Sequence, residues 1–168
     1  MEGSRVSKQW VDPVDRYFED FEVGDQVVTR GRTIDIGDIT LFAGLTGDHY
    51  PLHTDEEYAR GTQFGTRIAH GPLTFTIAVG LVGMTGWYGN AVRALLGIDG
   101  LRAKKVVLAG DTLHVVGTVL VAEVNGSGRS GAVTVGYSVR NQHDDEVMFF
   151  EQKNLMRCRP PAGPDAST

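Results

Sequence analysis

The stretch from Leu45 to Gly71 constrains this chain most, because a possible proton-transfer pair is followed there by the longest apolar segment. Gly47 and Pro51 punctuate its first half and predict a loop from Asp48 to His53. A loop can fold a carboxylate and an imidazole toward one point, where they can hold a water and move protons near neutral pH. From spacing alone a second interpretation stays open, in which Asp48 caps the next turn and His53 is a buried structural histidine.

The second half of this stretch leads into an apolar helix. Pro is favoured in the first turn of a helix, so Pro72 predicts a helix from Gly71 to about Met84. This helix is apolar nearly all round and should be buried. Its first N–H groups, including that of Gly71, point out of the N-terminus, where they can stabilise an oxyanion or a polarised carbonyl. The alternative is that Gly71 is only a packing glycine and His70 only a cap.

The rest of the chain predicts an α+β fold. Strands are expected over residues 26–34, 101–108, 112–125, 130–141 and 146–158, and short helices over 35–44 and 55–60. Asp38 is the expected N-cap of the first helix, whereas residues 91–100 fit a helical turn or a loop. One strand, a helical excursion and several antiparallel strands are typical of an α+β domain. We place it at residues 17–159, between an N-terminal tail (1–16) and a disordered C-terminal tail (160–168).

Composition limits the possible partners. The net charge of −5 argues against a nucleic-acid or anionic-membrane surface. The only cysteine, Cys158, cannot form an intrachain disulfide, and no apolar signal segment opens the chain, so we expect a cytoplasmic protein. No histidine stands at a ligand spacing that indicates a metal site. One local basic cluster can bind cofactor phosphates or simply form a solvated strand end: Arg102, Lys104 and Lys105.

Residues 42–53 (FAGLTGDHYPLH) resemble the hydratase-2 motif of the MaoC-like dehydratases, the family of (R)-specific enoyl-CoA hydratases. Residues 64–71, which end in Ile68-Ala69-His70-Gly71, resemble the next conserved block of this family. Residues 109–113 look like the turn that leads into one of its late strands, so the resemblance covers roughly residues 17–159. The sequence departs from the family pattern at Tyr50, where Asn is usual, and a Tyr is bulkier and donates only one hydrogen bond.

The resemblance implies a hot dog fold, in which a curved antiparallel sheet wraps around a long central helix. It also implies a homodimer or larger homo-oligomer with thioester sites near the subunit interface. Asp48 and His53 would bind a water that adds to a trans-2-enoyl thioester of coenzyme A or an acyl carrier protein, while Gly71 N–H polarises the carbonyl. No cofactor is expected beyond the coenzyme A of the substrate. The residues expected to bind substrate are Tyr50, Ile68, Ala69, His70, Arg102, Lys104 and Lys105.

Two other functions stay open at this point. The same architecture hosts acyl-CoA thioesterases, although these usually lack the Asp-x-x-Pro-x-His offset found here, and fold alone does not decide function. A non-catalytic hot dog subunit of a dehydratase complex is the other alternative. The intact Asp48 and His53 speak against that role, and Tyr50 speaks weakly for it.

Overall fold

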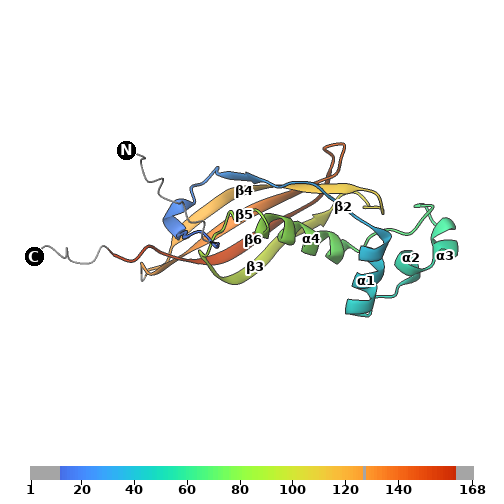
Figure 1. Cartoon of the computed structure of the whole chain (residues 1–168), viewed down its shortest axis with the longest axis horizontal. Helices are drawn as coiled ribbons and strands as arrows, with labels where there is room; N and C mark the ends of the chain where they lie inside the picture. The colour runs from blue at the N-terminus through green and yellow to red at the C-terminus, as the bar shows by residue number, and fades with distance from the viewer. Residues whose placement is uncertain (1–11, 127, 162–168) are drawn as a thin grey trace, which may run out of the picture.

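The computed structural model describes residues 12–126 and 128–161. Its strands form one antiparallel sheet in the order β1-β4-β5-β6-β3, with β2 also paired to β4. Figure 1 shows α4 lying along this sheet, while α1, α2 and α3 cluster beside one end of α4. The predicted α+β fold, with a sheet around a central helix, is therefore confirmed. No helix among the described residues is long and apolar enough to cross a membrane.

The elements follow in chain order. They are η1 (Phe18–Asp20), β1 (Gln26–Val28), β2 (Arg32–Thr33), α1 (Ile36–Thr46), α2 (Pro51–Thr54), α3 (Glu56–Arg60), α4 (Gly71–Gly83), β3 (Val92–Ala103), β4 (Thr112–Val124), β5 (Ser130–Arg140) and β6 (Glu146–Arg157). The helix predicted from Gly71 and the three late strands agree with α4, β4, β5 and β6. The turns after Asn125 and Asn141 close the two hairpins between these strands.

The core lies between α4 and the inner face of the sheet. Side chains on β6 and on the first half of β4 alternate between buried and partly exposed, as expected for strands with one face on the core, whereas β5 in the middle of the sheet is buried along most of its length. Ile77, Ala78 and Leu81 of α4 pack into this face together with Val115 and Phe150. These contacts hold α4 on the sheet and so place its N-terminus at Gly71.

Three predicted elements need correction. The strand expected over 26–34 is split into β1 and β2, because the Thr29 hydroxyl bonds to Val115 N (2.9 Å) where a backbone group would continue the ladder. Of the segment 91–100, residues 92–100 belong to β3, which ends at Ala103, and only residues 101–103 of the strand predicted over 101–108 are in it. The loop predicted from Asp48 to His53 is wrong in its second half, where Pro51 starts the short helix α2.

The predicted boundaries of the tails also change. Residues 1–11 and 162–168 lie outside the described part of the chain. Asp15 and Arg16, which we placed in the N-terminal tail, are fastened to the sheet: Arg157 Nη2 lies 2.9 Å from the Asp15 carboxylate and Arg16 N donates to Asn90 Oδ1 (3.0 Å). At the other end, Arg159 pairs with Asp20 at 2.6 Å.

The N-cap of α1 is Asp35 rather than the predicted Asp38. Asp35 Oδ1 accepts from Gly37 N (2.7 Å), and Asp38, three residues on, accepts from Asp35 N (2.9 Å). Together they form a capping box, in which each acid satisfies a backbone N–H at the end of the helix. Asp38 also holds Arg32 of β2 at 2.5 Å, so it links α1 to the sheet edge.

We expect Asp35→Ala to lower the free energy of unfolding by about 1 kcal/mol, because the Gly37 N–H loses its acceptor. Urea unfolding followed by circular dichroism measures this change. Asp35→Asn keeps an acceptor at the same place and serves as the matched control. Equal stability of the Ala and Asn variants would show that the cap contributes nothing.

Candidate active site

The turn after α1 presents Asp48. Gly47 ends α1 in the left-handed conformation (φ 78°), which glycine adopts without steric cost, and its N–H closes the helix on Ala43 O (2.8 Å). The reversal brings Asp48 out of the helix with an exposed side chain whose Oδ1 accepts weakly from Tyr50 N (3.3 Å). The carboxylate oxygens are therefore available to accept a hydrogen bond from a ligand such as water.

The second member of the pair, His53, is oriented by a backbone carbonyl. It lies on α2, and its Nδ1 is 2.8 Å from Ile68 O. Since a carbonyl oxygen only accepts, Nδ1 must carry the proton, and in the neutral ring Nε2 is left with the lone pair. His53 thus has one nitrogen that is anchored and one that is available as a base.

His70 lies directly beneath this pair. It is completely buried, its Nε2 donates to the backbone carbonyl of Asp48 (3.0 Å), and its ring stacks on that of His53 with centroids 3.8 Å apart and planes 26° apart. The ring of Phe42 packs against it at 5.0 Å. His70 occupies the N-cap position of α4 but makes no side-chain cap. His70 is therefore the N-cap of α4 by position, but its side chain supports Asp48 and His53, and its full burial speaks against the predicted substrate contact.

Asp48, His53 and His70 form one compact cluster, with a side-chain ligand atom of each within 4.8 Å of the others. One water with two ordinary hydrogen bonds spans roughly 4.6 Å between its partners, so the cluster can hold the predicted water. The spacing also suits a metal ion, but one nitrogen of each imidazole, His53 Nδ1 and His70 Nε2, already faces a carbonyl oxygen. The arrangement fits proton transfer better, and the absence of a metal stays a prediction.

The N-terminus of α4 opens next to this cluster. Gly71 is the first residue of α4, so its N–H has no partner within the helix. It lines a cavity of about 140 Å³ together with Ile68, Ala69 and Lys105. Four of the residues that the sequence singled out are therefore brought together at one cavity, which begins one residue away from His70.

The basic cluster is divided by its ion pairs. Lys104 pairs with Glu146, Lys105 lies 2.7 Å from Asp145, and Arg102 donates to the neighbouring carbonyl of Leu101 (2.9 Å). These contacts lower the pKa of Glu146 through hydrogen bonds from Lys104 and Ser138, and that of Asp145 mainly through Lys105. Of the three cations, Lys105 alone lines the described cavity beside Gly71. Their part in phosphate binding stays a prediction.

Tyr50 borders the site from the outer side. Its ring centroid is 6.4 Å from that of His53, and its hydroxyl lies 3.4 Å from the Tyr58 hydroxyl, a contact that raises the pKa of Tyr58. The segment that carries Ile68 is tied to α3, where Thr66 and Arg67 bond to Glu56 and lower its pKa. The outer wall of the site is thus braced. The most exposed residue of this wall is Tyr50, the position at which the motif departs from the family pattern.

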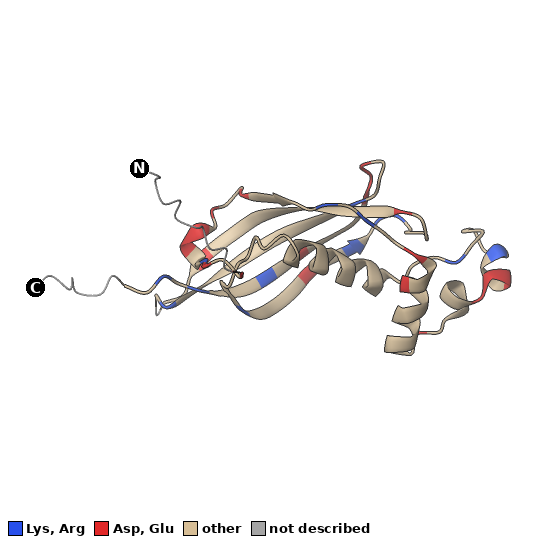
Figure 2. Cartoon of the chain, in the orientation of Figure 1, with Lys and Arg blue, Asp and Glu red and all other residues tan. Residues whose placement is uncertain are grey.

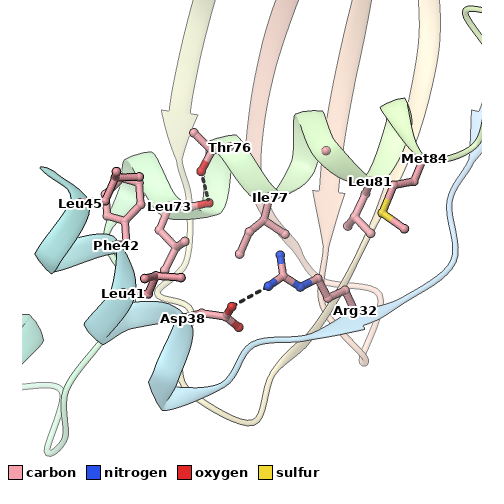
Figure 3. Close-up of a pocket in the computed structure, with 11 residues that line it drawn as sticks. Arg32, Asp38, Leu41, Phe42, Leu45, Leu73, Thr76, Ile77, Leu81 and Met84 are labelled. Carbon is pink, nitrogen blue, oxygen red and sulfur yellow. Dashed lines mark hydrogen bonds and ion pairs between the residues drawn. The ribbon is translucent and has the colours of Figure 1, made fainter.

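A second hollow, of about 290 Å³, lies between α1 and α4 (Figure 3). Leu41, Leu45 and Met84 stay largely exposed there, and the Arg32–Asp38 ion pair stands among the apolar side chains. Phe42 lines this groove and also contacts His70, so the groove borders the back of the site. The sequence did not indicate this groove, because its walls come from separate helices.

The single cysteine has no part in the site. Cys158 lies at the end of β6, and burial together with the neighbouring Glu19 carboxylate raises the pKa of its thiol. A thiol held in its protonated form is a poor nucleophile. Trp87 packs edge to face against Phe21 and Tyr88 packs tilted against the same ring, so both residues belong to the margin of the core.

The antiparallel sheet around α4 defines a hot dog protein, and Asp48 and His53 lie together near the N-terminal end of this helix. For the fold alone, a Mycobacterium tuberculosis protein with a double hot dog fold superposes with a TM-score of 0.72 over 89% of this chain and 46% of that one, at 22% identity. The sequence model of the MaoC like domain matches residues 20–143. The chain therefore belongs to the MaoC-like dehydratase family.

Individual relatives agree with this assignment. Protein MaoC of Klebsiella aerogenes is 36% identical over 113 residues, which are 67% of this chain and 33% of that protein. The (R)-specific enoyl-CoA hydratase of Rhodospirillum rubrum is 41% identical over 103 residues, 61% of this chain and 69% of that enzyme. A structure described as the monoamine oxidase regulatory protein of Archaeoglobus fulgius superposes with a TM-score of 0.82 and 35% identity over 86% of this chain and 96% of that one. This chain spans about a third of the length of the Klebsiella protein.

Proposed function

We propose that the protein is an (R)-specific hydratase/dehydratase of trans-2-enoyl thioesters carried by coenzyme A. The observation that carries this proposal is the cluster itself: an exposed carboxylate and a His53 ring with one free nitrogen face each other beside the N-terminus of α4. The relatives named (R)-specific enoyl-CoA hydratase and 3-hydroxybutyryl-CoA dehydratase support the same reaction.

In the hydration direction, Asp48 and His53 hold one water between them. His53 Nε2 takes a proton from this water while its oxygen bonds to C3 of the enoyl group and the C2–C3 π electrons move toward the thioester carbonyl. The Gly71 N–H donates to that carbonyl oxygen as it gains enolate character, and such a donor is typically worth about 2.7–4 kcal/mol. The pair then returns a proton to C2 on the same face, which gives the 3-hydroxyacyl thioester. Dehydration uses the same groups in reverse.

The stereochemistry of the product tests this proposal. The protein should convert crotonyl-CoA into (R)-3-hydroxybutyryl-CoA, identified by chiral chromatography of the released acid against both enantiomers. The thioester with the (S) configuration as the main product would contradict the proposed (R)-specific addition, because the water would then have attacked the opposite face of C3.

We also propose that the protein is a homodimer through β3. This strand pairs with β6 on one side, and its other edge has no strand partner among the described residues. Leu95, Leu96 and Leu101 stand more than one third exposed on it. A bare, apolar edge of this length is a site for pairing with a second copy, which agrees with the dimers that the family resemblance implies. The proposed location is the cytoplasm, in keeping with the free and buried Cys158.

Light scattering after gel filtration tests the dimer. The wild type should have twice the mass of the 18.2 kDa chain. Leu96→Lys places a charge on the edge and should shift the mass toward that of the monomer. Val124→Lys, at an equally exposed apolar position on β4, is the matched control and should stay dimeric. A wild-type mass near 18.2 kDa would contradict the proposal.

A further inference from the structure

Two buried amides on the inner face of β6 have no place in the reaction described so far. Gln152 is 7% exposed and Asn154 is 1% exposed, although the flanking inward positions of the strand hold Phe150 and Met156. Burying a polar group without its full set of hydrogen bonds costs free energy, on the order of 1–3 kcal/mol. Buried amides at such positions are therefore expected to have hydrogen-bond partners.

The hydrogen bonds of these amides leave one donor available. Gln152 Nε2 donates to Asn154 Oδ1 (3.1 Å), while Asn154 Nδ2 makes no hydrogen bond of ordinary geometry with the described residues. The Tyr88 hydroxyl bonds to that of Tyr137 (2.8 Å); burial raises the pKa of Tyr88 to about 12, although Tyr137 and the nearby Asn154 side chain both act to lower it. Asn154 therefore offers an N–H in a neutral, buried setting, which suits an oxygen acceptor.

These amides line a cavity of about 500 Å³ whose other walls are mostly apolar. Phe75 and Val79 of α4 and Leu95 of β3 form those walls. Figure 2 shows that α4 carries no charged residue, and the hydroxyl of Thr76 is engaged with Leu73 O (2.9 Å). An apolar cavity with a few convergent polar groups is the usual form of a small-molecule site.

The cavity lies farther along α4 than the one at the active site. Along α4, Gly71 and Thr74 line the first cavity, and the next residues, Phe75 and Thr76, line the second. On the facing strands the order is the same: Met148 and its β3 partner Ala103 line the first, and Asn154 and its partner Leu95 line the second. The two cavities share no lining residue, but they follow one another between α4 and the sheet edge, in line from Gly71 to the amides; we call this line the trough. Val79 is about 12 Å from Gly71 along the helix axis.

We propose that this trough holds the acyl chain of the substrate and that Gln152 and Asn154 select chains with a hydroxyl or carbonyl oxygen at their distal end. The proposal rests on the hydratase function proposed above, because that function places the thioester carbonyl at Gly71. The chain then lies along the apolar walls, and its terminal oxygen accepts from Asn154 Nδ2. A plain alkyl chain of equal length fills the same space but leaves this N–H without a partner.

Paired substrates test the selectivity. We compare kcat/KM for trans-2-decenoyl-CoA with that for its 10-hydroxy derivative, and for the corresponding hexenoyl and octenoyl pairs. For the chain length that fits the trough, the wild type should prefer the hydroxylated thioester by about tenfold, the effect of one buried hydrogen bond. A wild type that favours the plain alkyl chain at every length would overturn the proposal.

Variants of the two residues test whether the amides cause this preference. The double variant Gln152→Leu, Asn154→Leu replaces both partners by apolar groups of similar size, which is close to neutral for stability, and should abolish or reverse the preference. Lys153→Gln, on the opposite face of β6, is the matched control and should keep it. An unchanged preference in the double variant would overturn the proposal. A double variant that changes only the oligomeric mass would also overturn it, because that result would assign the amides to the subunit interface.

A binding measurement separates this proposal from the proposed function. Saturated decanoyl-CoA and 10-hydroxydecanoyl-CoA cannot be hydrated, and either ligand raises the melting temperature in proportion to its affinity. A larger shift with the hydroxylated ligand in the wild type, lost in the double variant, would support the trough even if the protein hydrated no enoyl thioester. Equal shifts with both ligands at all chain lengths would overturn it.

Discussion

Asp48→Asn and His53→Ala should each lower kcat for the hydration of crotonyl-CoA by about 10²–10⁴-fold, the usual contribution of a positioned acid or base. Asn keeps the shape of Asp48 but cannot carry the negative charge that orients the water. Ala at position 53 removes the nitrogen that takes the proton. Both side chains are at least partly exposed, so the melting temperature should change little.

The neighbouring histidine provides the matched control for these variants. His49 is adjacent to Asp48 and exposed, and it does not belong to the cluster of Asp48, His53 and His70. His49→Ala should keep kcat within about threefold of the wild type, since it removes no group that faces the water. Activity close to the wild type in Asp48→Asn or His53→Ala would remove these residues from the mechanism.

The second large effect is expected at His70. His70→Phe keeps a ring that can stack on His53 but loses the N–H that holds the Asp48 carbonyl. The catalytic turn should then shift, and a misplacement of about 1 Å at a reacting group can cost about 10²-fold in rate. Because His70 is fully buried and touches no substrate in our account, the loss should appear in kcat, with KM nearly unchanged.

A conservative variant separates positioning from simple stability. His70→Gln presents an amide N–H where Nε2 stands, so it should recover much of the rate lost in His70→Phe while losing the stacking. Phe42→Leu weakens the packing on the other side of His70 and serves as the stability control. If kcat followed the melting temperature across all three variants, His70 would be a packing residue only.

The sequence predicted the pair at the active site because its geometry is local. The two residues are five positions apart, and Gly47 and Pro51 force the turn between them, so their approach depends little on the rest of the fold. The helix from Gly71 could be predicted equally well, since Pro72 and a long apolar run determine it. The role of His70 could not be predicted, because its hydrogen-bond partner is a backbone carbonyl 22 residues earlier, and no side-chain pattern marks such a contact.

The missed features share a similar cause. The register of β3 is interrupted three times and the strand exposes apolar residues along its length, which hides the alternation that reveals other strands. Asp35 and Asp38 both satisfy the capping pattern, so only the structure shows which of them caps α1. The amides of β6 carried a usable signal: Gln152 and Asn154 share the parity of Phe150 and Met156, which places them on the inner face.

The most direct test of the account follows the enoyl-thioester absorbance of crotonyl-CoA together with a thiol reagent in the same solution. Hydration removes the conjugated double bond and leaves the thioester intact. We therefore predict that the wild-type protein abolishes the enoyl band without any release of thiol. Asp48→Asn should not abolish the band at a comparable rate, and it should release no thiol either. Release of thiol would show a thioesterase. Failure of the wild type to change the enoyl band would contradict the assignment of Asp48, His53 and Gly71 to hydration.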